Sequence, residues 1–333
     1  MPIAPAPLVE IWRGPFAESH HFGHAVICDD TGQIVEAWGD PDAVMLPRSS
    51  SKMIQALPLV TSGAASKFGL TESQLALSCA SHQGAPLHVD MANAWLADLG
   101  LDDDALRCGP QQTRDPDLKK EMIKTDQSPC QVHNNCSGKH CGFLTLTKHL
   151  GAGPEYVEID HPVQKAARDA FETVTGMDSP GYGIDGCSAP NFATTMHGMA
   201  RAMAFFASAH DRSDSLSQAA AQLVKAMYTY PENVAGEGRA CTELMRATTE
   251  PVALKTGAEG YFIAILPERR MGVALKALDG ATRASECTMA ALLVRLGVLD
   301  PNHPATLKRM NAPVTNWRGI ETGAIRPAPG LLA

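Results

Sequence analysis

The chain has 333 residues, of which 44% are hydrophobic and 19% charged, and its formal net charge at pH 7 is −8. This length suits one large domain or two, and it can bury a substantial core. No run of lysines and arginines provides the basic surface of a nucleic-acid-binding protein, which argues against that class. The most apolar helical stretch, residues 196–209, contains Arg201 and is too short to cross a membrane.

The first seven residues combine proline and alanine without a basic region and an apolar stretch, so we expect no secretory signal. The chain contains nine cysteines, an odd number at irregular spacing. Without an export signal, these are expected to be reduced thiols of a cytoplasmic protein, most of them buried in its core.

The N-terminal part predicts a small sheet that leads into a helix. Strand patterns occupy residues 8–12, 24–28 and 33–38. A turn at residues 29–32 makes the last two strands a hairpin. A helix over residues 51–60 follows, and Pro58 is expected to kink or end it.

A long, mainly helical section comes next. Helices are predicted over residues 71–77, 86–99, 137–150, 161–175, 190–207, 215–230 and 239–249. Thr71 and Gln74 have the spacing of a capping box at the start of the first one. The polar, irregular segment 103–136 is interpreted as a lid or a loop that lines a site.

Strand patterns return near the C-terminus. They cover residues 252–255, 260–266, 271–277 and 319–326, and a helix over residues 283–296 precedes the last of them. Strands at both chain ends with helices between them predict an α+β fold, in which one antiparallel sheet is built from both ends. We expect a single catalytic domain over residues 1–333, with the sheet from about 8–40 and 252–326 and a mostly helical region about 50–250.

Two short motifs indicate acyl transfer. Ser49 and Lys52 form a Ser-x-x-Lys at a helix start, where residues three apart lie on one face and the lysine amine can accept the serine proton. The positive end of the helix dipole favours an alkoxide there. Lys255-Thr256-Gly257 has the pattern of a strand that lines an acyl-binding serine site. The alternative for the first motif is a serine-rich helix start with a solvated lysine.

Ser81 is a second candidate serine, in the small, polar segment 78–84 that ends in glycine. Such a segment either brings backbone N–H groups close to a ligand or is a plain turn. Lys255 is the lysine that could partner it. Two lysines in one site would lower each other's pKa, which a lysine base requires.

A thiol-rich segment follows at residues 130–141, with three cysteines, two histidines and a lysine. The spacing of its cysteines matches no standard zinc pattern, but Cys187 could complete a metal site from a distance, with Asp185 as a ligand or an orienting group. The alternative is a catalytic cysteine, in which a cysteine–histidine dyad would do the chemistry. That dyad would combine Cys136 or Cys187 with His140 or His82. Cys241, at a predicted helix start, is either a reactive thiol or a core residue.

Five segments together resemble the rhizobial-type L-asparaginases, also called asparaginase II-like or class 3. They are Arg48-Ser49-Ser50-Ser51-Lys52, Ser78-Cys79-Ala80-Ser81-His82, His133-Asn134-Asn135-Cys136-Ser137-Gly138-Lys139-His140, Asp185-Gly186-Cys187-Ser188-Ala189-Pro190 and Lys255-Thr256-Gly257. The resemblance runs in order over most of the chain. It implies a fold like that of serine β-lactamases and β-lactamase-like glutaminases, and a homodimer that hydrolyses L-asparagine to L-aspartate and ammonia in amino-acid metabolism.

The resemblance also implies roles for single residues. Two Ser–Lys tandems are expected, Ser49 with Lys52 and Ser81 with Lys255, with Ser49 favoured as the nucleophile. One zinc ion per chain is expected to orient the substrate's α-groups, and its ligands would be Cys136, Lys139 and Cys187. The remaining substrate-binding residues predicted are Arg48, His82, Asp185, Thr256 and Gly257. The alternatives are a related amidase such as a glutaminase, a β-lactam-binding protein, and a non-enzymatic zinc-binding relative.

Overall fold

The computed structural model describes residues 3–332, and these form two compact units. The sheet unit comprises the chain up to Ser50, Thr194–Ser208 and the chain from Glu243. The helical unit comprises Ser51–Ala193 and Ala209–Thr242. Each unit is therefore built from segments that are distant in the sequence. The expected single catalytic domain stays a prediction.

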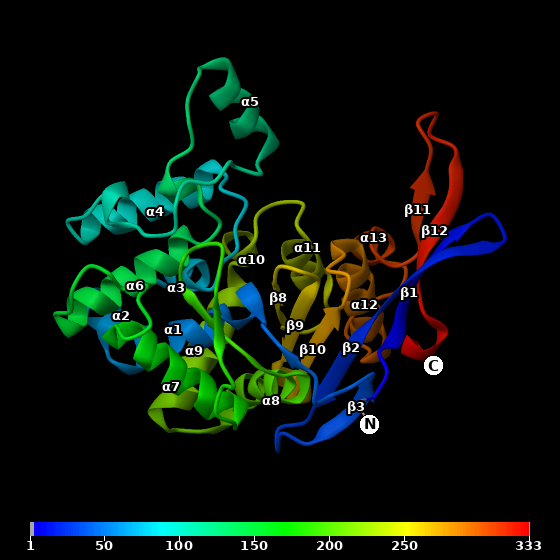
Figure 1. Ribbon diagram of the computed structural model, residues 1–333, viewed down its shortest axis with the longest axis horizontal. Helices are drawn as coiled ribbons and strands as arrows, with labels where there is room; N and C mark the ends of the chain where they lie inside the picture. Colours follow the sequence, from blue (N-terminus) through cyan, green and yellow to red (C-terminus); the bar gives the residue numbers. More distant parts are fainter. Residues whose placement is uncertain (1–2, 333) are drawn as a thin grey trace. The chain divides into compact units, whose positions relative to one another are not determined.

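The sheet unit is organised around one 8-stranded antiparallel sheet (Figure 1). Its strands are β1 (Ala6–Arg13), β2 (Phe16–Cys28), β3 (Ile34–Trp38), β8 (Ala253–Thr256), β9 (Tyr261–Leu266), β10 (Met271–Ala277), β11 (Ala312–Thr315) and β12 (Glu321–Pro327). Their order is β11-β12-β1-β2-β10-β9-β8, and β3 pairs with β2 beside this path. β10, from near the C-terminus, pairs with β2, from near the N-terminus. The predicted α+β fold with a sheet from both chain ends is therefore confirmed.

The centre of this sheet is covered by two helices, α8 (Met196–Ala207) and α12 (Thr282–Arg295), which both pack on β9 and β10. All six residues of β9 are buried. Because neighbouring side chains of a strand point to opposite faces, both faces of β9 are covered, and its sequence is a continuous apolar run. At Gly272 of β10 an added Cβ would lie 2.1 Å from the backbone nitrogen of Ala204, so α8 packs directly on the strand backbone.

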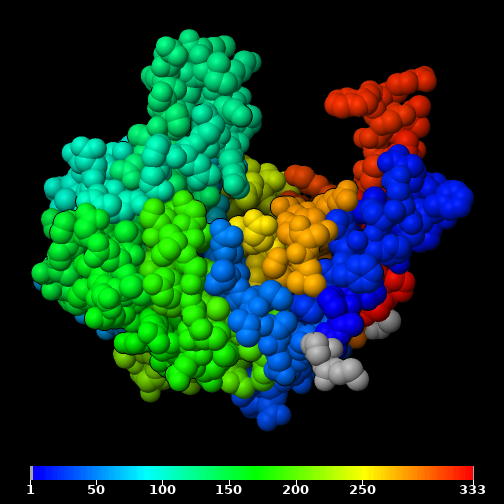
Figure 2. Space-filling model, viewed as in Figure 1, coloured from blue at the N-terminus to red at the C-terminus, as the bar shows by residue number. Residues whose placement is uncertain are grey.

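The helical unit packs around α1 (Lys52–Thr61), of which Lys52 to Leu59 are all buried. A helix buried on every side is a core helix. The other helices that lie wholly in this unit include α2 (Ala64–Lys67), α3 (Glu72–Ser78), α4 (Pro86–Asp98), α5 (Pro116–Lys124), α6 (Ser137–Leu150), α7 (Pro162–Thr175), α9 (Ser215–Thr229) and α10 (Pro231–Val234). α1 contacts α3, α6, α7 and α9. In Figures 1 and 2, α5 and its flanking loops extend outward from α4.

Several boundaries differ from those predicted. The helix expected over residues 190–207 is divided: Pro190–Phe192 is β6, which pairs with β5 (Tyr182–Ile184), and the helix begins only at Met196. The Thr195 hydroxyl accepts a hydrogen bond from Gly198 N at 2.9 Å and fixes that start.

The helix expected over residues 51–60 is α1, which contains Pro58 and ends three residues after it, at Thr61. One further expectation was wrong. The segment 103–136 contains a helix, α5, where only irregular structure was expected. Its start carries a recognisable signal: the Asp115 side chain accepts from Leu118 N at 2.9 Å, and proline occupies the first helical position.

Two short strands beside the sheet were not predicted: β4 (Val44–Met45) pairs with β7 (Thr194–Thr195). A short helix expected between the helix 283–296 and the last strand is α13 (Pro304–Leu307), which precedes β11. The helix α11 (Ala240–Ala247) includes the point in the sequence, between Thr242 and Glu243, where the helical unit ends and the sheet unit resumes.

No helix among residues 3–332 has the length and apolarity needed to span a bilayer.

Candidate active site

The three serines before α1 have different surroundings. They lie in a 3₁₀ turn, η1 (Arg48–Ser51), that leads directly into the helix. Ser50 is 0% exposed and its hydroxyl donates to the Lys255 carbonyl at 3.0 Å, and Ser51, 1% exposed, accepts from the Asn191 side chain at 3.4 Å. Ser49 is the only one of the three that is not buried. Its partial exposure fits a residue that reaches a substrate.

The backbone at this turn is strained. Arg48 has a backbone φ of +52°, in the left-handed region that residues other than glycine seldom adopt. Such residues cluster at active sites and ligand clamps. The strained residue directly precedes Ser49, and the role of this turn in the site stays a prediction.

Lys255-Thr256-Gly257 lies against the same turn. An added Cβ at Gly257 would lie 2.6 Å from the Pro47 carbonyl oxygen and 2.9 Å from Ser50 Oγ, so only glycine allows β8 to approach so closely. Lys255 is 1% exposed, and its amine donates to the Thr256 carbonyl at 2.7 Å. The sheet unit thus brings the predicted lysine strand beside the predicted serine turn.

The helical unit places Lys52 against Ser81. Lys52 Nζ lies 3.0 Å from Ser81 Oγ and 3.1 Å from Cys136 Sγ, and it also donates to the Ala80 carbonyl and, at 3.5 Å, to the Asn135 carbonyl. The lysine is 1% exposed. No carboxylate among the described residues forms an ion pair with it. A buried amine held next to a serine hydroxyl is the arrangement that Ser–Lys chemistry requires.

The segment that carries Ser81 is held by its main chain. Ser81 N donates to the Val234 carbonyl at 2.9 Å, and His82 N to the Asn135 carbonyl at 3.2 Å. His82 is 0% exposed. Its Nδ1 accepts from Gly84 N at 3.1 Å, so in this tautomer its Nε2 donates to Ser137 Oγ at 3.0 Å. The predicted contact of His82 with substrate stays a prediction, and its present contacts fix the Ser81 segment.

The two predicted tandems involve residues of both units, since Ser49 and Lys255 belong to the sheet unit and Lys52 and Ser81 to the helical unit. Both tandem pairings stay predictions. What was not predicted is the direct contact of Lys52 with Ser81 and with Cys136. The sequence carried one signal for it: Cys136 belongs to the most specific part of the resemblance, residues 134–140.

The predicted metal ligands converge within the helical unit. Cys136, Lys139 and Cys187 are between 2% and 4% exposed, and Lys139 Nζ lies 3.1 Å from Cys187 Sγ. The neighbouring Cys136 thiol, together with the Lys139 charge, holds the pKa of Cys187 well below its usual value. Cys187 and burial raise the pKa of Cys136. The two thiols and the buried amine therefore influence one another's protonation.

This donor set fits a zinc ion, because thiolates are preferred zinc ligands. No group of three His, Cys, Asp or Glu side chains converges within residues 3–332, so the third protein donor would be the lysine. Burial lowers the pKa of Lys139, but the two thiols and Asp185 outweigh it and the net shift is upward. A zinc ion held by this amine would therefore have to displace its proton.

The other cysteines of the thiol-rich segment do not join this cluster. Cys130 Sγ lies 3.2 Å from His133 Nδ1, and Cys141 is fully buried with its thiol 3.9 Å from the Ala92 carbonyl. Cys241 is also buried, at 1% exposure, which fits the core interpretation. The cysteine–histidine alternative keeps one supporting observation, since His140 lies close enough to lower the pKa of Cys187.

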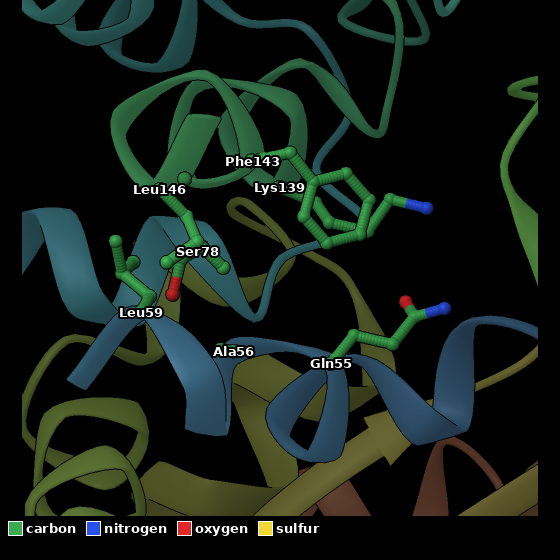
Figure 3. A pocket seen from close by; sticks show the side chains of 8 residues that line it. Gln55, Ala56, Leu59, Ser78, Lys139, Phe143 and Leu146 are labelled. Atoms are coloured by element: carbon green, nitrogen blue, oxygen red, sulfur yellow. The ribbon is translucent and has the colours of Figure 1, made fainter. Parts of the chain in front are cut away.

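A small cavity lies beside Lys139, as Figure 3 shows. Its volume is about 10 Å³, and it is lined by Gln55, Ala56, Leu59, Ser78, Lys139, Gly142, Phe143 and Leu146. The Lys139 amine and the Gln55 amide point to the same side, away from Ser78. A space of this size holds about one water molecule, so it is not a substrate pocket.

Comparisons with known proteins agree with the sequence resemblance. The family model described as L-asparaginase II matches residues 9–327. No curated protein matches the chain. Among solved structures, Mglu in its tris and glutamate form is 14% identical, with 86% of this chain and 62% of that chain covered at a TM-score of 0.46. A class C beta-lactamase mutant is 12% identical, with 79% and 89% covered at a TM-score of 0.42. The chain thus spans less than two thirds of that Mglu chain.

Proposed function

The chain belongs to the L-asparaginase II family and is an amidohydrolase, and from this premise we propose that it hydrolyses L-asparagine to L-aspartate and ammonia through a serine acyl-enzyme. The observation that carries the proposal is the contact of Lys52 Nζ with Ser81 Oγ at 3.0 Å. It supplies a hydroxyl and an amine that can exchange a proton, inside a buried site where electrostatic interactions are strong.

The chemistry needs two steps. A serine oxygen adds to the side-chain amide carbon while its proton passes to a lysine amine; the carbon–nitrogen bond then breaks, and the proton leaves with ammonia. Water next adds to the acyl-enzyme and releases aspartate and the serine. Backbone N–H groups, that of Ser49 among them, would stabilise the oxyanion.

Two serines can be the nucleophile. Ser49 is the one predicted from its spacing to Lys52, and its partial exposure beside the strained Arg48 supports that choice. Ser81 is favoured by its direct contact with Lys52. We propose Ser49 as the nucleophile with Lys52 as base, and Ser81 with Lys255 as the relay that passes the proton to ammonia.

The other predicted residues surround this chemistry. Arg48, Asp185, Thr256 and Gly257 are proposed to contact the substrate. A zinc ion, held by Cys136, Lys139 and Cys187, would supply a fixed positive charge that orients the substrate's α-groups. A homodimer in the cytoplasm is part of the same proposal.

The direct test measures ammonia release from purified protein with L-asparagine and with L-glutamine. We expect turnover of asparagine to exceed that of glutamine greatly. Equal rates would favour the glutaminase alternative, and zinc binding without ammonia release from either would favour the non-enzymatic relative.

A further inference from the structure

One backbone carbonyl, that of Asn135, serves both the candidate base and the candidate serine of the helical unit. It accepts from His82 N at 3.2 Å, which holds the segment that carries Ser81. It also accepts from Lys52 Nζ at 3.5 Å, and the same amine donates to the Ala80 carbonyl. Two carbonyl oxygens therefore face an amine that is only 1% exposed.

These two carbonyls determine how the Lys52 amine is turned. A carbonyl oxygen can only accept, so one N–H bond of the amine must point at Ala80 and another at Asn135. A neutral amine, the form that a base requires, has two N–H bonds and one lone pair. The lone pair is then left for the remaining neighbours, Ser81 Oγ at 3.0 Å and Cys136 Sγ at 3.1 Å. The carbonyls thus turn the proton-accepting side of the amine toward the serine.

The peptide unit that carries the Asn135 carbonyl is anchored by the side chain of Asn134. The N–H of this peptide unit belongs to Cys136, and it donates to Asn134 Oδ1 at 2.9 Å. Because a peptide unit is planar, holding its N–H also fixes the direction of its C=O. Asn134 Nδ2 in turn donates to the carbonyls of Cys108 and Gly109, both at 2.9 Å.

The chemistry of the Asn134 carboxamide suits this position. The residue is 5% exposed, and both ends of its carboxamide are hydrogen-bonded. Its NH₂ group meets two carbonyl oxygens and its oxygen meets an N–H, so only one orientation of the amide satisfies all three partners. A fixed connection therefore runs from the loop at residues 108–109, through Asn134 and one peptide unit, to the Lys52 amine.

A second side chain holds the preceding peptide unit. Asn135 N donates to Gln111 Oε1 at 3.1 Å. The main chain of Asn135 is thus held on both sides, by Gln111 and by Asn134. Gln111 is half-buried, whereas its neighbour Gln112 is exposed. The chain therefore offers Gln112 as a matched control for Gln111.

We propose that Asn134, supported by Gln111, is a positioning residue that turns the Lys52 amine toward Ser81 through the Asn135 carbonyl. Catalytic groups must be held within a narrow range of productive geometry, and hydrogen-bonded supports of this kind provide it. The inference rests on the proposed amide hydrolysis, in which Lys52 accepts a serine proton. It adds to that mechanism two residues that do not touch the reacting atoms.

The test is a double-mutant cycle between Asn134→Ala and Lys52→Met, with ammonia release from L-asparagine as the readout. Asn134→Ala should lower kcat about 10-fold when Lys52 is present, the order expected for a lost buried hydrogen bond. It should lower kcat less than twofold when Lys52 is already methionine, because the group it positions is then missing. KM should stay within twofold, since the amine takes part in proton transfer. A loss caused by unfolding or by the thiol cluster would persist without Lys52.

Gln111 supplies milder variants in case Asn134→Ala does not fold. Gln111→Met removes the acceptor at similar length and should lower kcat about 3-fold. Gln111→Glu keeps an acceptor oxygen and should recover most of this loss, and Gln112→Met should match the wild type. Circular dichroism and thermal unfolding confirm folding in each case.

Equal losses from Asn134→Ala with and without Lys52, or equal losses in Gln111→Met and Gln112→Met, would overturn the inference. Wild-type protein that releases no ammonia from asparagine would instead refute the proposed function. Crystal structures of Asn134→Ala and Gln111→Met would then decide the inference by themselves. A displaced Lys52 amine would support it, and an amine that keeps its contacts with the Asn135 carbonyl and Ser81 Oγ in both variants would overturn it.

Discussion

Lys52 Nζ lies 3.0 Å from Ser81 Oγ, although the two residues are 29 positions apart and lie on different elements of the helical unit. The same amine lies 3.1 Å from Cys136 Sγ, and Cys136 and Cys187 shift each other's pKa in opposite directions. One chain of contacts therefore joins the candidate base, a candidate nucleophile and the predicted metal ligands. A change at any one of them is expected to affect the others.

Lys52→Met should lower kcat for asparagine by about 10²- to 10⁴-fold, the usual contribution of a positioned base. Methionine keeps most of the length and apolar contacts of the lysine but cannot accept a proton. Lys148→Met is the control, because Lys148 is an exposed lysine of the same unit whose amine donates to the Leu99 carbonyl. Steady-state kinetics on folded variants check the prediction, and similar losses in both variants would show that the effect is structural.

Replacing the two serines separately should identify the nucleophile. Ser49→Ala is expected to abolish turnover and to leave no acyl adduct, whereas Ser81→Ala should slow both steps but still permit an adduct on Ser49. Rapid acid quench followed by intact mass and peptide mapping locates the aspartyl group. An adduct on Ser81 in the wild type would transfer the role of nucleophile to that residue. Ser50→Ala is a poor control, since Ser50 is buried and bonded to the Lys255 carbonyl.

Purified protein should contain about one zinc per chain, as measured by elemental analysis. Cys187→Ser should lose most of this zinc, because a hydroxyl is a weak zinc ligand beside a thiolate. Cys130→Ser should retain it, since Cys130 contacts His133 outside the cluster. Equal zinc content in all three proteins, or none in the wild type, would remove the metal from the proposal.

The sequence predicted the sheet well because its strands carry strong local patterns. The buried run of β9 and the hairpin around Thr31 and Gly32 are set by neighbouring residues, and β2 and β3 indeed pair there. Long helices such as α6 and α9 were also predicted close to their observed bounds. Errors arose at boundaries between adjacent elements, as in the predicted helix 190–207, where the strand β6 precedes α8.

The candidate site was predictable in its residue types but not in its pairings. The motif spacing suggested Ser49 for Lys52, because only near neighbours can be compared in a sequence. The contact with Ser81 depends on how α1 packs beside the segment held by Val234 and Asn135, which is a long-range property.

Glu243→Gln should destabilise the sheet unit at neutral pH. Glu243 accepts from Lys308 at 2.8 Å and from the buried Arg309 at 2.6 Å. Partial burial raises the pKa of Glu243, but these two cations outweigh it and leave its pKa below the usual value. We expect a loss of about 1–3 kcal/mol, the range for a hydrogen bond to a charged group.

The sign of the pH dependence follows from that lowered pKa. A carboxylate with a lowered pKa in the folded state adds stability above its unfolded pKa, and loses that contribution as the pH falls through its folded pKa. The gap between wild type and Glu243→Gln should therefore be full at pH 7 and shrink below about pH 4, near the ordinary glutamate pKa. Denaturant unfolding at pH 7, 5 and 3.5 measures it. Glu250→Gln, which removes a pairing with the more exposed Arg269, is the control and should cost less. A gap that widens on acidification would contradict the assignment.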